Sequence, residues 1–158
     1  MDFNLINVGI ADYAVSTSPD ILRTILGSCV GICLFDREKK IGGLSHIMLP
    51  ELKFKSSIKK YADSAIPSML EEMLTAKARR DKIVAKIVGG SKMFQVSDNS
   101  LMGEIGRNNV AKVKEVLSKL GLSIIAEDVG GDYGRTVDFY LETGELRIRS
   151  IGRNEKII

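Results

Sequence analysis

Hydrophobic residues in the first fifty positions occur in short runs, and turn-forming or charged residues separate the runs. The runs cover residues 5–10, 13–15, 21–26, 29–35 and 41–49. Runs of this length with such boundaries are typical of strands. The charged segment 36–40 predicts a turn between the last two strands, so that they form a hairpin. We expect this hairpin to bring Cys29 and His46 into register near its open end.

Two later segments repeat their apolar residues at spacings of three and four, which is the period of one helix face. The first segment begins at Tyr61, and its apolar stripe consists of Ala62, Ala65, Ile66, Met69, Leu70, Met73 and Leu74. In the second segment Asn108 or Asn109 is the candidate N-cap, and Gly121 is the candidate stop signal. Its apolar stripe consists of Val110, Val113, Leu117 and Leu120. Both segments are predicted to be amphipathic helices.

Four further strands are predicted in the second half of the chain. They cover residues 82–88, 123–126, 136–141 and 145–151, and the last two form a hairpin. The glycine-rich acidic segment 127–135 is interpreted as a solvated turn. About seven or eight strands with two main helices predict an α+β fold. We expect one domain over residues 1–158, a sandwich with both helices packed on one side of a mostly antiparallel sheet.

Composition and charge narrow the class of protein. Of the 158 residues, 44% are apolar and 27% are charged, as in ordinary globular domains. The net charge is only +3, and no run of Lys or Arg indicates a nucleic-acid partner or an anionic membrane. No signal peptide is recognisable, and no apolar stretch approaches the ~20 residues that a membrane helix needs. These features predict a cytoplasmic protein without membrane insertion.

Metal and cofactor sites are poorly supported by the sequence. The chain has one histidine and two cysteines, too few ligands for a structural zinc site. Cys29 and Cys33 would lie about 13 Å apart along one strand, too far for a disulfide. The Gly89-Gly90-Ser91-Lys92 segment lacks the spacing of a phosphate-binding loop, and no calcium-loop spacing occurs. We therefore expect neither a metal nor a cofactor.

Cys29 and His46 are the candidate catalytic pair. Cys29 follows a Gly27-Ser28 corner, and His46 is the only histidine. A cysteine thiol ordinarily has a pKa of about 8.5, so it needs a neighbouring base to act as a nucleophile at neutral pH, and imidazole is the usual one. The pair therefore indicates acyl transfer through a thioester. The residues alone leave a second interpretation open, in which both side chains only pack in the core.

Several motifs, in order along nearly the whole chain, carry a resemblance to one family. They are Thr24-Ile25-Leu26-Gly27-Ser28-Cys29-Val30, the segment 42–50 with His46, Leu49 and Pro50, and segments 60–65, 89–94, 105–110, 126–131 and 134–135. Together they resemble the CheD family of bacterial and archaeal chemoreceptor glutamine deamidases. No single motif is specific, but their joint order is.

The resemblance implies a protein-glutamine glutaminase that acts on methyl-accepting chemotaxis receptors. It implies that Cys29 is the nucleophile, His46 the general base and acid, and Thr24 the residue that orients His46. His46 is then expected to hold Cys29 as a thiolate. Gly27 and Ser28 are expected to form the substrate or oxyanion region, and the backbone N–H groups around Ser28 and Cys29 are the candidate oxyanion donors. The same machinery can hydrolyse a glutamyl methyl ester, and the CheC phosphatase is implied as a partner.

Other interpretations remain open at this point. The chain can act mainly as a regulatory partner of CheC and receptors, with weak catalysis. It can also be another thiol acyl transferase, such as a peptidase or a transglutaminase-like enzyme. A further set of residues either contacts the substrate or serves only packing and loop geometry: Ser28, Tyr61, Phe94, Asn108 and Arg135.

Overall fold

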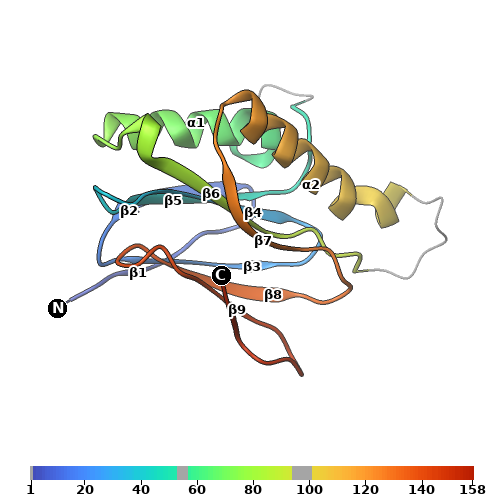
Figure 1. Cartoon of the computed structure of the whole chain (residues 1–158). Coiled ribbons are helices and arrows are strands. Elements are labelled where there is room, and N and C mark those ends of the chain that lie inside the picture. Colours follow the sequence, from blue (N-terminus) through green and yellow to red (C-terminus); the bar gives the residue numbers. More distant parts are fainter. Residues whose placement is uncertain (1, 53–56, 94–100) are drawn as a thin grey trace.

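The protein folds into three layers, two β-sheets packed face to face and a pair of helices on the outer face of one sheet (Figure 1). The computed structural model describes residues 2–52, 57–93 and 101–158. The α+β class and the two main helices are confirmed. The strands are more numerous than expected, ten among the described residues, and they form two sheets rather than one.

The middle layer is the sheet that carries His46. Its strand order is β2 (Asp12–Thr17), β5 (Ile41–Ile47), β4 (Val30–Asp36), β6 (Ile83–Gly89) and β7 (Ile124–Val129). Every residue of β4 and β5 is buried, because these strands have a neighbouring layer on each face. Only the β6–β7 pairing is parallel in this sheet.

The outer sheet has the order β1 (Leu5–Asn7), β3 (Ile21–Leu26), β8 (Arg135–Tyr140), β9 (Leu146–Arg149) and β10 (Lys156–Ile157). All its pairings are antiparallel except β1 with β3. Side chains from its inner face meet those of β4 and β5 in one hydrophobic core, which includes Leu22, Leu26, Cys33, Leu44, Val137 and Phe139.

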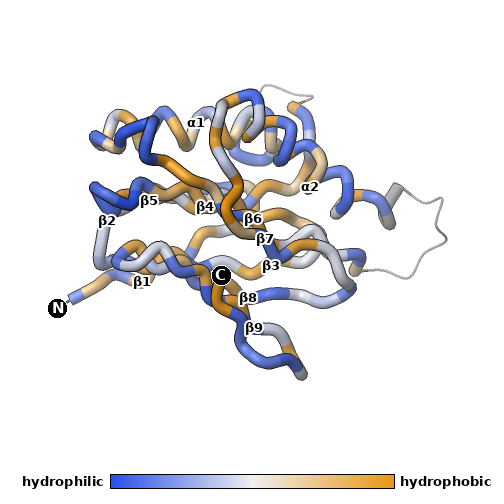
Figure 2. Tube along the Cα trace, in the orientation of Figure 1, coloured by the Kyte–Doolittle hydropathy of each residue, from blue (hydrophilic) through white to orange (hydrophobic). Residues whose placement is uncertain are grey.

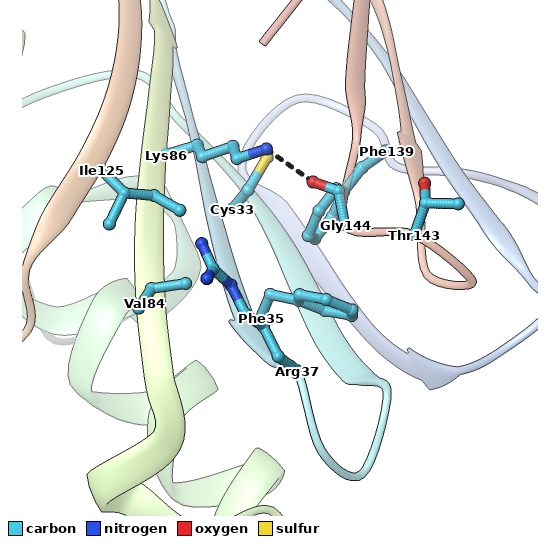
Figure 3. A pocket seen from close by; sticks show the side chains of 9 residues that line it. All are labelled: Cys33, Phe35, Arg37, Val84, Lys86, Ile125, Phe139, Thr143 and Gly144. Atoms are coloured by element: carbon cyan, nitrogen blue, oxygen red, sulfur yellow. Dashed lines mark hydrogen bonds between the residues drawn. The ribbon is translucent and has the colours of Figure 1, made fainter.

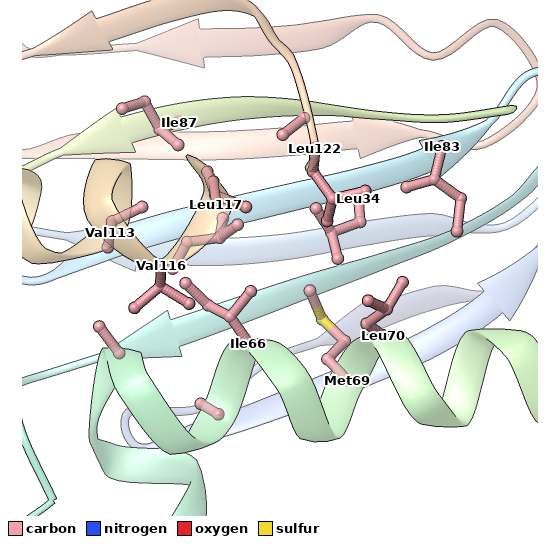
Figure 4. Close-up of a cluster of buried hydrophobic side chains, with 14 of the residues drawn as sticks. Leu34, Ile66, Met69, Leu70, Ile83, Ile87, Val113, Val116, Leu117 and Leu122 are labelled. Atoms are coloured by element: carbon pink, nitrogen blue, oxygen red, sulfur yellow. The ribbon is translucent and has the colours of Figure 1, made fainter. Parts of the chain in front are cut away.

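The helices α1 (Ala62–Thr75) and α2 (Leu101–Lys119) cover the other face of the middle sheet, and two 3₁₀ turns, η1 (Ile58–Lys60) and η2 (Arg80–Lys82), flank α1. Figure 2 shows hydrophobic and hydrophilic residues alternating along α1, as its sequence pattern predicts. Six of its seven predicted stripe residues are buried, and Leu74 is partly buried beside them. Figure 4 shows this second core, in which Ile66 lies near Val116, whereas Met69 and Leu70 lie toward Leu34 and Ile83.

The predicted hairpin of β4 and β5 is confirmed, but Cys29 and His46 are not paired with one another in it. Asp36 pairs with Ile41 at the closed end, and Gly31 pairs with His46 near the open end. The strand begins at Val30, so Cys29 lies directly before it rather than inside it. Cys29 and His46 are therefore at the same end of the hairpin.

Two boundary predictions are wrong. Helix α2 begins at Leu101, so Asn108 and Asn109 lie inside it rather than capping it. Asn109 is fully buried and its amide bonds to carbonyls outside the helix, which leaves it no capping role. Residues 127–129, predicted to be part of a turn, belong to β7 and pair with β6. Gly121 does end α2, with a φ of 72° that suits glycine.

Neither described helix is long and apolar enough to cross a membrane.

Candidate active site

His46 projects from the middle sheet into the layer between the two sheets. Side chains alternate along β5, and Leu44 and His46 face the outer sheet. There His46 meets Thr24 of β3, which shares its face with the core residues Leu22 and Leu26. Both His46 and Thr24 are buried, at 2% and 3% exposure.

The hydrogen bonds of Thr24 assign the tautomer of His46. The Thr24 hydroxyl donates its only proton to the Val8 carbonyl, with an O···O distance of 2.7 Å. The same Oγ1 lies 2.7 Å from His46 Nδ1, so it accepts a hydrogen bond there. The imidazole proton is therefore on Nδ1, and Nε2 carries a free lone pair.

Nε2 of His46 is buried and has no hydrogen-bond partner among the described residues. Burial lowers the pKa of His46 from 6.5 to about 4, because the charged imidazolium is poorly solvated there. At neutral pH the ring is thus a neutral base with an open acceptor.

Cys29 is half-buried and packs against the core between the two sheets, the same layer into which His46 projects. Burial raises the pKa of its thiol, and the N–H of Cys29 itself acts in the opposite direction. The two pKa shifts favour a neutral thiol and a neutral imidazole. This differs from the expectation that His46 holds Cys29 as a thiolate, because desolvation disfavours both charges.

The backbone of the Cys29 loop, residues 27–29, is held by three hydrogen bonds. The Gly27 carbonyl accepts from Ser91 N–H at 3.0 Å, and the Cys29 carbonyl accepts from Gly90 N–H at 2.8 Å. The Ser28 carbonyl accepts from the Asn109 side-chain amide at 3.3 Å. In a planar trans peptide the N–H points opposite to the C=O, so the N–H groups of Ser28 and Cys29 face away from these partners.

The Gly89-Gly90 pair permits this close packing. A Cβ on Gly89 would lie 2.5 Å from the Cys29 carbonyl oxygen, and one on Gly90 would lie 2.5 Å from Val110 of α2. Both residues also have positive φ angles, of 103° and 69°. The motif thus serves close backbone contact with the Cys29 loop.

Two of the other candidate residues lie together. Tyr61, buried at the start of α1, and Asn108 of α2 line one groove between α2 and residues 49–51. Arg135 is buried in an ion pair with Asp128 and donates to Ser91 Oγ at 2.7 Å, so segment 127–135 is more than a solvated turn. Phe94 lies outside the described residues.

Asn109 was predicted as a candidate helix N-cap, but it lies buried inside α2. It lies four residues before Val113 and so extends the buried stripe of α2 by one turn. A polar residue at a stripe position was the signal that could have identified it.

The second cysteine belongs to the core. Cys33 is 1% exposed, and burial raises the pKa of its thiol to about 12. Figure 3 shows Lys86 beside it, with the ammonium donating to the Gly144 carbonyl at 2.7 Å. Within the described ranges, no three His, Cys, Asp or Glu side chains converge as a metal-binding group.

Cys33→Ala should therefore cost stability rather than activity. We expect a loss of about 1 kcal/mol in the free energy of unfolding, because a small buried group is removed. Turnover should stay within about twofold of the wild type. Urea denaturation and a deamidation assay measure the two quantities. Loss of activity in a folded Cys33→Ala variant would mean that this thiol takes part in the reaction.

The site combines a thiol, a neutral base of defined tautomer and a fixed backbone loop. These groups together suit nucleophilic attack on an acyl carbon.

Comparison with known proteins identifies the family of the chain. The family model described as CheD chemotactic sensory transduction matches residues 48–150. This match begins after Cys29 and His46, so longer alignments are needed to cover the candidate site.

Similar proteins supply that coverage. One from Caldanaerobacter subterraneus subsp. tengcongensis is 47% identical over all of both chains. One from Methanococcus vannielii is 48% identical over 92% of this chain and 94% of its own. Both are named probable chemoreceptor glutamine deamidase CheD. A crystal structure of a Neisseria meningitidis protein, described by the family model DUF152, covers 82% of this chain and 62% of its own at 10% identity, with a TM-score of 0.44. The full-length likeness and the family match show that this chain belongs to the CheD family.

Proposed function

We propose that this protein deamidates glutamine side chains of chemoreceptors, with Cys29 as the nucleophile and His46 as the general base. One observation carries the assignment of residues: His46 is buried with Nδ1 bonded to Thr24 and Nε2 unpartnered among the described residues, at the same end of the hairpin as Cys29. The substrate class rests on the names of the full-length relatives.

The first step is attack on the substrate amide. Because the pKa shifts favour neutral groups, the thiol proton passes to Nε2 as sulfur attacks the carboxamide carbon, rather than beforehand. A C–S bond forms, and the carbonyl oxygen takes the negative charge. The imidazolium that results keeps its Nδ1–H bond to Thr24, which stabilises it in the buried layer.

The second step releases ammonia, and the third releases the product. His46 returns its proton to the departing nitrogen, the C–N bond breaks, and a thioester on Cys29 remains. Water then attacks this thioester with His46 as base, which gives glutamate and the free thiol. A glutamyl methyl ester can pass through the same steps, with methanol as the leaving group.

The backbone N–H groups of Ser28 and Cys29 are the proposed oxyanion donors. The carbonyls of Gly27 and Ser28 are bound on the opposite side, so these N–H groups are left to face a ligand. Gly27 also brings the loop close to Met93, whose Cγ would lie 3.2 Å from a Cβ at that position.

The two hydrophobic cores share strand β4, because its Val30 belongs to one core and its Cys33 to the other. We therefore infer one deamidase domain over residues 1–158. Two free thiols fit a reducing cytoplasm, where methyl-accepting receptors present their signalling regions. The CheC phosphatase stays a predicted partner.

Mass spectrometry of a receptor cytoplasmic fragment tests the activity. Wild-type protein and Cys33→Ala should add about 1 Da per converted glutamine and release ammonia, whereas Cys29→Ala should do neither. An unchanged mass with tight binding to CheC or receptor would support the regulatory interpretation instead. Cleavage of the receptor backbone would make the protein a peptidase.

Thr24→Val should slow deamidation by about ten- to a hundredfold, since it leaves the buried Nδ1–H without an acceptor. The loss should appear in kcat, because Thr24 lies behind His46 and away from the receptor. Thr24→Ser retains the hydroxyl and should keep most of the rate. Equal rates in Thr24→Val and wild type would remove Thr24 from the mechanism.

A further inference from the structure

Asn109 of α2 reaches the backbone on both sides of the site. Its Nδ2 lies 2.9 Å from the Met48 carbonyl, two residues after His46, and 3.3 Å from the Ser28 carbonyl, directly before Cys29. Both neighbours are acceptors, so the amide nitrogen rather than the oxygen must face them. The side chain is fully buried, and its Oδ1 has no partner among the described residues.

The bond to Ser28 determines where the next N–H points. Ser28 C=O and Cys29 N–H belong to one planar peptide and point in opposite directions. By holding the carbonyl toward α2, Asn109 turns the Cys29 N–H to the other side. The same amide also donates to the carbonyl of Met48, which directly follows the end of β5. One side chain therefore holds both the Cys29 loop and the segment after the strand that carries His46.

Helix α2 also packs on Gly90 and Ser91, the segment that holds the Cys29 loop. A Cβ on Gly106 would lie 2.5 Å from the Gly90 carbonyl oxygen and 2.7 Å from that of Ser91. Gly90 and Ser91 are the residues whose N–H groups hold the carbonyls of Cys29 and Gly27. Asn109 follows Gly106 by three residues and so lies on the same face of the helix.

We propose that Asn109 is a positioning residue for the deamidase reaction, which aims the Cys29 N–H at the oxyanion by holding the Ser28 carbonyl. This inference rests on the proposed function. It assigns α2 a role in the reaction through an amide that touches neither the thiol nor the imidazole.

Asn109→Asp tests the proposal with a change of almost no volume, since it places an oxygen where the carbonyls need a donor. We expect kcat for a receptor fragment to fall by about a hundredfold. KM and the rate of Cys29 alkylation by iodoacetamide should stay within about twofold, because alkylation forms no oxyanion. Asn154→Asp, at an exposed position, makes the same charge change and should match the wild type.

Two results would overturn the inference: an unchanged kcat, or a fall in kcat and alkylation together, which would indicate a displaced loop. If Asn109→Asp does not fold, Asn109→Ala removes the donor without adding an oxygen, and its kcat should fall in the same way. An unchanged kcat in Asn109→Ala would also overturn the inference. Failure of the proposed function looks different, since the wild type itself would then leave the receptor fragment unchanged.

Discussion

The Cys29→Ser variant is expected to lose glutamine deamidation by roughly 10⁴-fold or more while it stays folded. A serine hydroxyl is a far weaker acid than a thiol, and a buried imidazole with a pKa of about 4 is too weak a base to activate it. Cys29 is only half-buried, so the free energy of unfolding should change by less than about 1 kcal/mol.

Steady-state ammonia release and thermal unfolding measure the two effects. The matched control is Cys33→Ser, which alters a buried thiol in the core between the sheets and should cost stability instead. If Cys29→Ser kept a tenth of the wild-type rate, the thiol would not be the nucleophile.

His46→Asn is expected to lower deamidation by about 10²- to 10⁴-fold, because it removes the general base. Asparagine is the informative replacement, since its amide nitrogen can take the place of Nδ1 and donate to Thr24. The bond to Thr24 is then kept while the Nε2 acceptor is lost. Near-normal turnover in a folded His46→Asn variant would show that proton transfer uses another group.

The pH dependence follows from the same histidine. Its native pKa is about 4, so the neutral base persists from pH 7 down to roughly one unit above that value. Deamidation should therefore show no fall near the ordinary histidine pKa of about 6.5. If the rate halves near pH 6.5, the histidine in the reaction has an ordinary pKa and is therefore exposed to solvent.

Stability should respond to pH in the same window. Between the unfolded pKa of 6.5 and the native value of about 4, the unfolded chain binds more protons than the native protein. The free energy of unfolding contributed by His46 therefore decreases as the pH falls through this window, by up to about 1.4 kcal/mol per pH unit. Urea denaturation at several pH values should show a shallower slope for His46→Asn than for the wild type.

Local patterns predicted the elements that carry Cys29 and His46, the proposed catalytic pair. The charged turn at 36–40 and the apolar runs around it predicted the hairpin that brings Cys29 and His46 to the same end, although His46 pairs with Gly31 rather than with Cys29. Thr24 is also predictable in this way, because the alternation of Leu22, Thr24 and Leu26 turns all three side chains inward. The hydrogen bond between Thr24 and His46 crosses from one sheet to the other, and no local pattern specifies which sheets stack.

Contacts between distant segments account for what was missed. Asn109 suits a helix cap by residue type, but tertiary hydrogen bonds to Ser28 and Met48 determine its place inside α2. Segment 127–135 has the composition of a solvated turn, yet its Arg135 is buried and donates to Ser91 Oγ, 44 residues earlier in the chain. Burial of polar groups depends on partners that lie far away in the sequence.

Trapping the acyl-enzyme tests the central claim most directly. Wild-type protein is mixed with a receptor cytoplasmic fragment, quenched in acid and digested, and the Cys29 peptide is analysed by mass spectrometry. We predict a Cys29 peptide joined to a receptor glutamine with loss of ammonia, and conversion of that glutamine to a hydroxamate when hydroxylamine is present. Receptor deamidation with neither adduct nor hydroxamate, or an adduct on Cys33, would contradict the account.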